Sequence, residues 1–258
     1  MLNRLLSYRI IWANIKSFTK ITHSRNRFFP TLSILYIVPT PIGNLADITY
    51  RAVEILGSVD LIACEDTRVS KTLLSHYGIE KPLIAFHQHN EHKQVERLIT
   101  ELKTGRSLAL ISDAGTPGIS DPGFLLIRRA RQDALPVVAL PGPDAATTAL
   151  VTSGLPCDRY IYEGFLPHKK GRKTRLDRLI DEERTVVLYE SPHRIMKLIS
   201  ELSERCDPDR MVAVTRELTK TYEEVIRGTI RQVSETLQER DGVKGEICVI
   251  LAGKDYKE

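Results

Sequence analysis

The sequence lacks the cysteine patterns of a zinc site or a disulfide framework. Its 4 cysteines lie far apart along the 258 residues, with no CxxC motif and no neighbouring Cys/His pair. Zinc sites need ligands at short spacings, and disulfide frameworks belong to small secreted domains. We therefore expect no metal site, and we interpret most of these cysteines as buried free thiols in a reducing cytoplasm. They are Cys64, Cys157, Cys206 and Cys248.

The sequence also lacks the two common nucleotide-binding signatures. Neither GxGxxG nor GxxxxGK[ST] occurs, so hydride transfer and nucleoside-triphosphate chemistry lose their usual support. The composition, with 42% hydrophobic and 27% charged residues, is that of a globular chain. Its length suits one large domain or two small ones.

Residues 1–34 differ from the rest of the chain. They carry six basic residues and no acidic one, so the net charge of +4 leaves the remainder formally at −2. Global charge therefore does not argue for a nucleic-acid partner. The longest apolar run in this N-terminal extension is too short to span a bilayer, and we expect no membrane partner. We rank a misplaced start codon first, an organellar transit peptide second, and a membrane-surface or RNA-binding arm third.

From Leu35 onward, short apolar runs alternate with helical periods, which is typical of α/β units built on parallel strands. A helix is expected over 91–105, because its apolar residues share one face and Gly105 suits a C-cap. That face consists of Val95, Leu98, Ile99 and Leu102. The strands expected in this N-terminal domain, residues 35–152, are 35–38, 59–65, 82–86, 107–112 and 136–140.

A Gly- and Pro-containing segment at 153–158 is interpreted as a linker, and we predict a C-terminal α/β domain over 159–258. The strands at 210–217 and 222–229 follow each other too closely for a crossover, so a hairpin there would make the second sheet mixed. The other expected strands are 159–165, 185–190 and 246–253, with helices near 171–183 and 192–205.

Three loops that follow predicted strands hold the candidate ligand-binding residues, because open α/β sheets bind ligands beyond the carboxyl ends of their strands. They are VPTPIGN at 38–44, SDAGTPGISDPG at 112–123 and ALPGPDAATTAL at 139–150. The second loop is longer than a plain connection needs, and its glycines allow close backbone approach to a ligand. A structural alternative is a turn in which Asp121 caps the next helix.

Five segments, in order, resemble the rRNA small-subunit methyltransferase I family of the tetrapyrrole-methylase superfamily. They are LYIVPTPIGNLADITYRAVEIL, VDLIACEDTR, ISDAGTPGISDPG, LPGPDAATTAL and LYESPHRI. The resemblance covers nearly the whole chain past residue 34. It implies the α/β tetrapyrrole-methylase fold, with a mainly parallel N-terminal sheet, a mixed C-terminal sheet and an S-adenosylmethionine cleft between the two domains.

The same resemblance implies an activity, partners and a cofactor site. The implied reaction is 2'-O-methylation of a cytidine in the decoding region of small-subunit (16S) rRNA, on rRNA or on the assembled small ribosomal subunit, usually by a homodimer. We accordingly expect a cytoplasmic enzyme. The matching positions for S-adenosylmethionine are Pro41, Ile42, Asp113, Ala114, Gly115, Thr116, Gly118, Ile119, Ser120, Pro141, Gly142 and Ala145.

An RNA substrate is also indicated by the basic segment HKKGRKTR at 168–175, which brings cations together at a predicted helix start. Cations that neutralise phosphates add affinity without reading sequence. The alternative is a solvated basic loop. The candidate RNA-binding residues are His168, Lys169, Lys170, Arg172, Lys173, Arg175, His193 and Arg194.

A base is needed to deprotonate a ribose hydroxyl, and three segments supply candidates: EDTR, FHQHNE and YESPHR. The residues do not single out one of them, and each also suits a structural role such as a cap. Arg68 could pair with a phosphate or with the neighbouring Asp66. The candidates are Glu65, Asp66, Arg68, His89 and Glu190.

Two other function classes remain open. A tetrapyrrole methyltransferase would bind a large, carboxylate-rich disc between its domains, and a flexible basic segment makes a poor wall for such a ligand. A catalytically silent RNA-binding module would have no reason to keep the small residues of the cofactor loops, yet Gly115, Gly118 and Gly142 are all present.

Overall fold

The computed structural model describes residues 33–258, and the predictions for the N-terminal extension lie outside this range except at Ser33 and Ile34. Residues 33–258 form one compact unit that contains two β-sheets. No helix within this range is long and apolar enough to cross a membrane. The same residues hold no group of three or more His, Cys, Asp or Glu side chains placed to bind a metal ion.

The first sheet is parallel throughout, in the order β3-β2-β4-β1-β5. Its strands confirm the alternating pattern predicted for the first half of the chain. The central strand β4 is buried along its whole length, as expected for a sheet covered on both faces. The strands are β1 (Leu35–Ile37), β2 (Leu61–Cys64), β3 (Leu83–Ala85), β4 (Leu108–Ile111) and β5 (Val137–Ala139).

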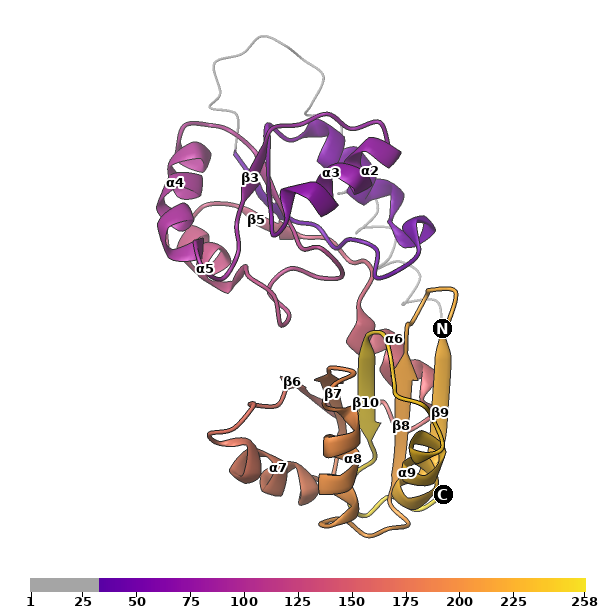
Figure 1. Cartoon of the computed structure of the whole chain (residues 1–258). Helices are drawn as coiled ribbons and strands as arrows, with labels where there is room; N and C mark the ends of the chain where they lie inside the picture. Colours follow the sequence, from indigo (N-terminus) through magenta and orange to yellow (C-terminus); the bar gives the residue numbers. More distant parts are fainter. Residues whose placement is uncertain (1–32) are drawn as a thin grey trace, which may run out of the picture. The chain divides into compact units, whose positions relative to one another are not determined.

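Helices cover both faces of this sheet (Figure 1). Helices α4 (Glu91–Lys103) and α5 (Phe124–Gln132) pack on one face, and α2 (Tyr50–Ser58) and α3 (Thr67–His76) pack on the other. A short 3-10 helix, η2 (Leu45–Asp47), precedes α2. The apolar face predicted for α4 is buried, as expected from its spacing.

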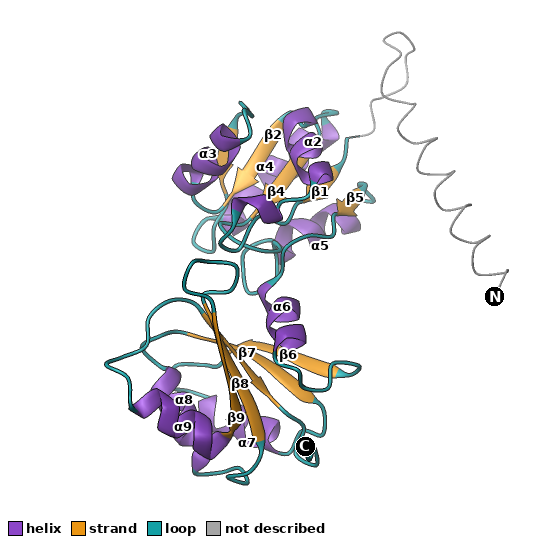
Figure 2. Cartoon of the chain, turned by 90° about the vertical axis from the view of Figure 1, so that its right-hand side faces the viewer, coloured by secondary structure: helices purple, strands orange, loops and turns teal. Residues whose placement is uncertain are grey.

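The second sheet is mixed, in the order β6-β7-β10-β8-β9 (Figure 2). Strands β6 and β7 pair in parallel, and the other pairs are antiparallel. The predicted hairpin is confirmed by the antiparallel pairing of β8 with β9. The strands are β6 (Tyr160–Phe165), β7 (Thr185–Glu190), β8 (Met211–Arg216), β9 (Glu224–Thr229) and β10 (Ile247–Leu251).

Alternate residues of the second sheet enter two different cores, because side chains of a strand point to opposite faces in turn. Val186 and Leu188 pack with α7 (Arg172–Ile180), α8 (Ile195–Ser203) and α9 (Ile230–Gln238). Val187 packs on the opposite face with α6 (Ala145–Thr152), which belongs to the stretch predicted as the N-terminal domain. This packing favours a domain boundary before Ala145, and we propose that position in place of 153–158.

The suggestion that Asp121 caps the next helix is wrong. Helix α5 begins after Gly123, and no side-chain hydrogen bond caps it within the described chain. Asp121 instead lies in the wall of the cavity described below. The free cysteines only partly match the prediction, since Cys64 and Cys248 are buried but Cys157 is exposed.

Candidate active site

The loops after β1 and β4 are joined by backbone hydrogen bonds. Thr40 and Gly115 form an isolated antiparallel bridge, in which each N–H donates to the other residue's carbonyl oxygen at 2.9 Å. The Thr40 hydroxyl also donates to the Ser112 carbonyl oxygen at 3.0 Å. Gly115 has φ +78°, a left-handed conformation that a residue with a side chain rarely adopts. The two loops therefore hold each other in one arrangement.

The loop after β5 packs against both of these loops. A Cβ atom on Gly142 would lie only 2.7 Å from the Cβ of Pro39, so only glycine fits this approach. The Thr116 hydroxyl donates to the Pro143 carbonyl oxygen at 3.2 Å. All three predicted ligand-binding loops thus form a connected rim at the carboxyl edge of the first sheet.

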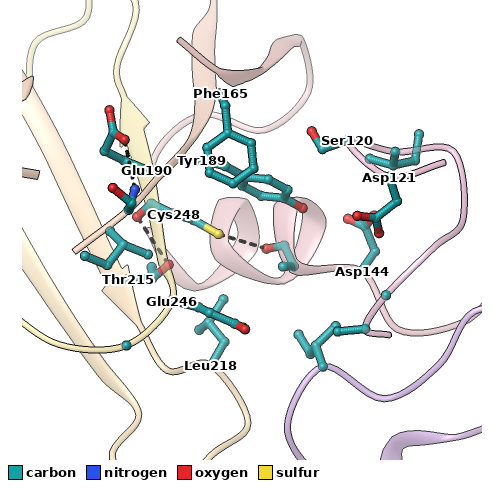
Figure 3. Close-up of a pocket in the computed structure, with 18 of the residues that line it drawn as sticks. Ser120, Asp121, Asp144, Phe165, Tyr189, Glu190, Thr215, Leu218, Glu246 and Cys248 are labelled. Atoms are coloured by element: carbon teal, nitrogen blue, oxygen red, sulfur yellow. Dashed lines mark hydrogen bonds between the residues drawn. The ribbon is translucent and has the colours of Figure 1, made fainter. Parts of the chain in front are cut away.

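A cavity of ≈340 Å³ lies between this rim and the second sheet (Figure 3). Its volume is within the range of small-molecule sites, roughly 300–1,000 Å³. From the first sheet's side it is lined by Ile42, Ala114, Gly115, Thr116, Ile119, Ser120, Asp121, Asp144 and Ala145. From the second sheet's side it is lined by Phe165, Tyr189, Glu190, Ser191, Pro192, Thr215, Leu218, Gly245, Glu246, Ile247 and Cys248.

The cavity wall combines small or apolar surfaces with carboxylates, and among its described lining residues there is no lysine or arginine. Four carboxylate residues take part, Asp121, Asp144, Glu190 and Glu246, of which Glu190 is paired with Arg172 and Arg194 and so adds little negative charge to the wall. A positively charged ligand is favoured by such a wall, and flat or aliphatic groups fit the small residues beside it. The residues therefore fit S-adenosylmethionine, whose sulfonium and ammonium groups are cationic.

Seven of the predicted cofactor-binding residues line the cavity, and the other five do not. The lining residues are Ile42, Ala114, Gly115, Thr116, Ile119, Ser120 and Ala145. Pro41, Asp113, Gly118, Pro141 and Gly142 lie in the same loops outside the lining. Gly142 and Asp113 hold neighbouring backbone in place, since Gly142 packs on Pro39 and the Asp113 carboxylate accepts a hydrogen bond from the Asp66 N–H at 3.0 Å.

The second sheet's share of the wall was missed by sequence reasoning, apart from Glu190. Four of these residues belong to the segment LYESPHRI, which carries the family resemblance but did not by itself indicate a cavity wall; most of the others lie at the ends of β6, β8 and β10, outside the segments singled out in the sequence. Burial raises the pKa of the Cys248 thiol to about 12, so this residue stays neutral at physiological pH. Only the packing of the two sheets identifies such residues as part of a site.

Three aromatic residues form a cluster at the cavity. Phe165 and Tyr189 line it, and Tyr162 packs against Tyr189. The rings of Tyr162 and Tyr189 meet edge to face with centroids 5.4 Å apart, and those of Phe165 and Tyr189 with centroids 5.5 Å apart. Tyr162 is hydrogen-bonded to Ser120 at 2.6 Å, which joins the loop after β4 to the second sheet. Phe165 and Tyr189 face the cavity side by side (Figure 3).

The base candidates of the EDTR segment follow β2, beside the loop after β4. The Asp66 side chain caps α3 and forms an ion pair with Arg68 at 2.6 Å, one of the two pairings that the sequence left open. Hydrogen bonds from Arg68 lower the pKa of Asp66 to about 2. Glu65 is different: burial, with the charges of Asp121 and Asp113, raises its pKa to about 6.

The base candidate of the YESPHR segment is held in a buried ion-pair network. The Glu190 side chain is 0% exposed and lies 2.7 Å from Arg194 and 3.5 Å from Arg172. Arg172 also pairs with Glu201 of α8 at 2.8 Å. The Glu190 carboxylate is therefore committed to two guanidinium groups.

The remaining candidates lie farther along the first sheet. His89 is exposed and follows β3, the edge strand that is separated from β4 by β2. Its ring lies 6.0 Å from that of His87. Neither histidine lines the cavity.

The basic segment 168–175 divides into exposed cations and one buried arginine. His168, Lys169, Lys170 and Lys173 are exposed, and Arg175 is exposed but pairs with Glu163. Arg172 is only 4% exposed and pairs with Glu201 in the network described above. The geometry therefore does not suit Arg172 for the phosphate contact that the sequence predicts.

Arg194, a second predicted RNA contact, is likewise engaged. It pairs with Glu190, and its side chain is 17% exposed. It also donates to the Leu166 carbonyl oxygen at 3.2 Å. His193, next to it, is exposed. These contacts make Arg194 part of the framework between β7 and the basic segment.

The fold and the cavity define a member of the methylase class. The family model described as Tetrapyrrole (Corrin/Porphyrin) Methylases matches residues 34–234. Among solved structures, a uroporphyrin-III-C-methyltransferase from Thermus thermophilus is 20% identical with a TM-score of 0.59, over 86% of this chain and 94% of that one. A cobalt precorrin-4 methyltransferase is 17% identical with a TM-score of 0.65, over 89% and 98%. At these identities the likeness shows the fold alone, and it confirms the predicted fold class.

Closer relatives narrow the assignment. Ribosomal RNA small subunit methyltransferase I of Haemophilus influenzae is 51% identical over 223 residues, which cover 86% of this chain and 79% of that protein. The protein of the same name from Bacillus subtilis is 46% identical over 228 residues, covering 88% and 77%. The chain belongs to the ribosomal RNA small subunit methyltransferase I family, as its five sequence segments predict.

Proposed function

We propose that this chain is an S-adenosylmethionine-dependent rRNA methyltransferase that methylates the 2'-hydroxyl of a cytidine in the decoding region of small-subunit rRNA. One observation carries the proposal: the last residue of β6 lines a cavity suited to a cationic cofactor, and the exposed cations of the basic segment follow that strand directly in the chain. Phe165 lines the cavity, and Lys169 and Lys170 follow it by a few residues. Cofactor and polyanion would therefore bind side by side. The names of the relatives support the same substrate class.

S-adenosylmethionine supplies an electrophilic methyl group, and the protein's task is to position the acceptor and receive its proton. We assign the proton-accepting role to Glu65. Glu65 does not itself line the cavity, but its pKa of about 6 is raised by burial and by the charge of Asp121, which does line it. A carboxylate with this pKa is ionised at neutral pH yet basic enough to accept a proton. The other carboxylate candidates, Asp66 and Glu190, are both engaged with arginines.

The carboxylates of the cavity wall would hold the cofactor. The Asp121 carboxylate lies in the loop after β4, and burial raises its pKa above the ordinary value. Asp144 caps α6 through the Thr147 N–H at 2.7 Å, which fixes the position of its second oxygen. The glycine-containing loop after β4 brings backbone groups against the remaining polar atoms of the ligand.

A tetrapyrrole methyltransferase is the second candidate, because the similar solved structures include enzymes with that chemistry in their titles. The exposed cations at 168–173 favour RNA. Tetrapyrrole carboxylates would also be attracted by them, so the assay must include both substrates. The third class, a silent RNA-binding module, would have no use for a cavity of this size.

The decisive assay uses labelled S-adenosylmethionine and small ribosomal subunits from a strain that lacks the enzyme. We expect label on one nucleotide, resistant to alkaline cleavage on its 3' side, which nuclease digestion would locate. Subunits from the parent strain are the control and should accept no label. Transfer to a tetrapyrrole precursor but not to rRNA would refute the proposal.

We also propose that the protein acts as a homodimer in the cytoplasm, where ribosomal subunits are assembled. The family resemblance is the support for the dimer. Light scattering at several protein concentrations would test it, and a single monomeric mass throughout would contradict it. The same assay on naked rRNA and on assembled subunits would decide which of the two is the substrate.

A further inference from the structure

Phe165 is a large apolar residue left half exposed at a functional cavity. It is the last residue of β6, lines the cavity and is 52% exposed. An exposed aromatic ring forgoes the stabilisation that burial would provide. Single exposed apolar residues are common on protein surfaces, so it is the position of this ring in the wall of the cavity that marks it as a candidate ligand contact.

The ring is also held in place from behind. It meets Tyr189 edge to face, Tyr189 meets Tyr162 in the same way, and Tyr162 is hydrogen-bonded to Ser120. The next residue, Leu166, is 2% exposed and anchors the chain in the core between the helices and the second sheet. Phe165 is therefore a rigid platform, with little conformational freedom to lose when a ligand binds.

The platform lies between the cavity and the exposed cations of the basic segment. Lys169 is four positions farther along the chain, a stretch that spans at most about 14 Å when extended. A nucleotide whose phosphates contact Lys169 and Lys170 would thus place its base near Phe165. Its sugar, which joins the base to the phosphates, would then lie between Phe165 and the lysines, beside the cavity that Phe165 lines.

We expect the methylated nucleotide to leave the stack of its neighbours so that its ribose can reach the cavity, as nucleotides do in enzymes that act on extruded bases. Proteins stabilise unstacked RNA bases by offering an aromatic face in place of the lost neighbour. We infer that Phe165 is the stacking surface for the base of the nucleotide that is methylated. The inference rests on the proposed function and names a substrate contact that the function requires.

The test compares Phe165→Leu with Phe165→Tyr and Phe165→Trp. Leucine keeps an apolar side chain but removes the aromatic face, whereas tyrosine and tryptophan retain it. We expect kcat/KM for small subunits to fall roughly 5- to 100-fold in Phe165→Leu and to stay within a few-fold of wild type in the two aromatic variants. Because Phe165 also lines the cavity, the Kd for S-adenosylmethionine, measured by calorimetry without RNA, should rise by much less than kcat/KM falls.

Tyr50→Leu is the matched control, because Tyr50 is 98% exposed at the start of α2 and does not line the cavity. Equal activity of Phe165→Leu and wild type would overturn the inference while leaving the proposed function intact. A parallel loss of cofactor affinity in Phe165→Leu would also overturn it, since the ring would then belong to the cofactor site. Absence of methyl transfer to rRNA by the wild type would overturn the proposed function, and the inference with it.

Discussion

The hydroxyls of Ser120 and Tyr162 lie 2.6 Å apart and join the loop after β4 to the first strand of the second sheet. Ser120 adopts φ +60°, a left-handed conformation that is costly for a residue other than glycine. Gly164 makes room for this contact, since a Cβ there would lie 3.0 Å from the Ser120 oxygen. The strained loop is thus fastened at the wall of the cavity.

This link predicts the behaviour of Ser120→Ala and Tyr162→Phe. Each removes one hydrogen bond, so we expect roughly 2- to 10-fold weaker S-adenosylmethionine binding, measured by calorimetry. The double variant should be no weaker than either single variant, because both remove the same bond. Ser120→Gly should unfold at a higher temperature than Ser120→Ala, since glycine relieves the backbone strain. Fully additive losses in the double variant would show that the two hydroxyls act separately.

The raised pKa of Glu65 predicts that activity and stability change in opposite directions as the pH rises. If it accepts the proton, the rate of methyl transfer should rise with pH through about 6 and then level off. Because its pKa is raised from 4.5 to about 6 on folding, the folded state binds the proton more tightly, and stability should fall as pH rises across that interval. Above about 6 this contribution is constant.

Glu65→Gln separates these effects. We expect a loss of roughly 10²- to 10⁴-fold in kcat, with no loss of thermal stability at pH 7, since a partly buried charge is removed. Glu54→Gln, at an exposed position of α2, is the control and should change neither. An unchanged kcat in Glu65→Gln would exclude Glu65 as the base.

The basic segment predicts two distinct phenotypes. Replacing Lys169, Lys170 and Lys173 together by alanine should weaken RNA binding and reduce the salt dependence by about 2 in the slope of log K against log [salt]. Stability and cofactor affinity should be unaffected, because all three side chains are exposed. An unchanged slope would mean that these lysines do not contact phosphate.

Arg172→Met should act on folding instead. It removes the buried partner of Glu201 and one of the two arginines paired with Glu190. Because Arg194 still pairs with Glu190, we expect a cost at the lower end of the range for a broken buried ion pair, about 3 kcal/mol in the free energy of unfolding. Denaturant titration would measure this, with Arg178→Ala of the same helix as an exposed control expected within about 0.5 kcal/mol of wild type. If Arg172→Met were as stable as the wild type but bound RNA more weakly, the phosphate contact predicted from the sequence would be supported instead.

Two glycines predict opposite responses to the same substitution. Gly142→Ala should weaken cofactor binding and lower the unfolding temperature, because the new methyl group would lie 2.7 Å from Pro39. Gly57→Ala, inside α2 with nothing within 4 Å, should stabilise the protein by roughly 0.5–1 kcal/mol. A harmless Gly142→Ala would show that the loop after β5 can shift without disturbing the site.

Much of the fold follows from local pattern. Val95, Leu98, Ile99 and Leu102 are spaced for one helical face, and all four are buried in α4. The short interval between β8 and β9 allowed only a hairpin, and the two strands pair antiparallel. The three predicted ligand-binding loops were recognisable because prolines and glycines gather where parallel strands end.

Other features depended on long-range contacts. The basic segment contains five lysine and arginine residues that the sequence alone does not distinguish. In the structure Arg172 is buried against Glu190 and Glu201, whereas its neighbours are exposed. Helix α6 follows a loop of the first sheet but packs on the second. Neither outcome is visible in local spacing, because each depends on which surfaces meet in the folded chain.

The sequence by itself determined the strands, the helices, the family and the loops of one cavity wall, since these depend on periodicity and on residues close together in the chain. Only the tertiary structure decided the other wall, formed by the ends of β6, β7, β8 and β10, and the different environments of Glu65 and Glu190. Burial and charge partners come from segments far apart in sequence. A carboxylate's chemistry is therefore settled only when those segments pack together.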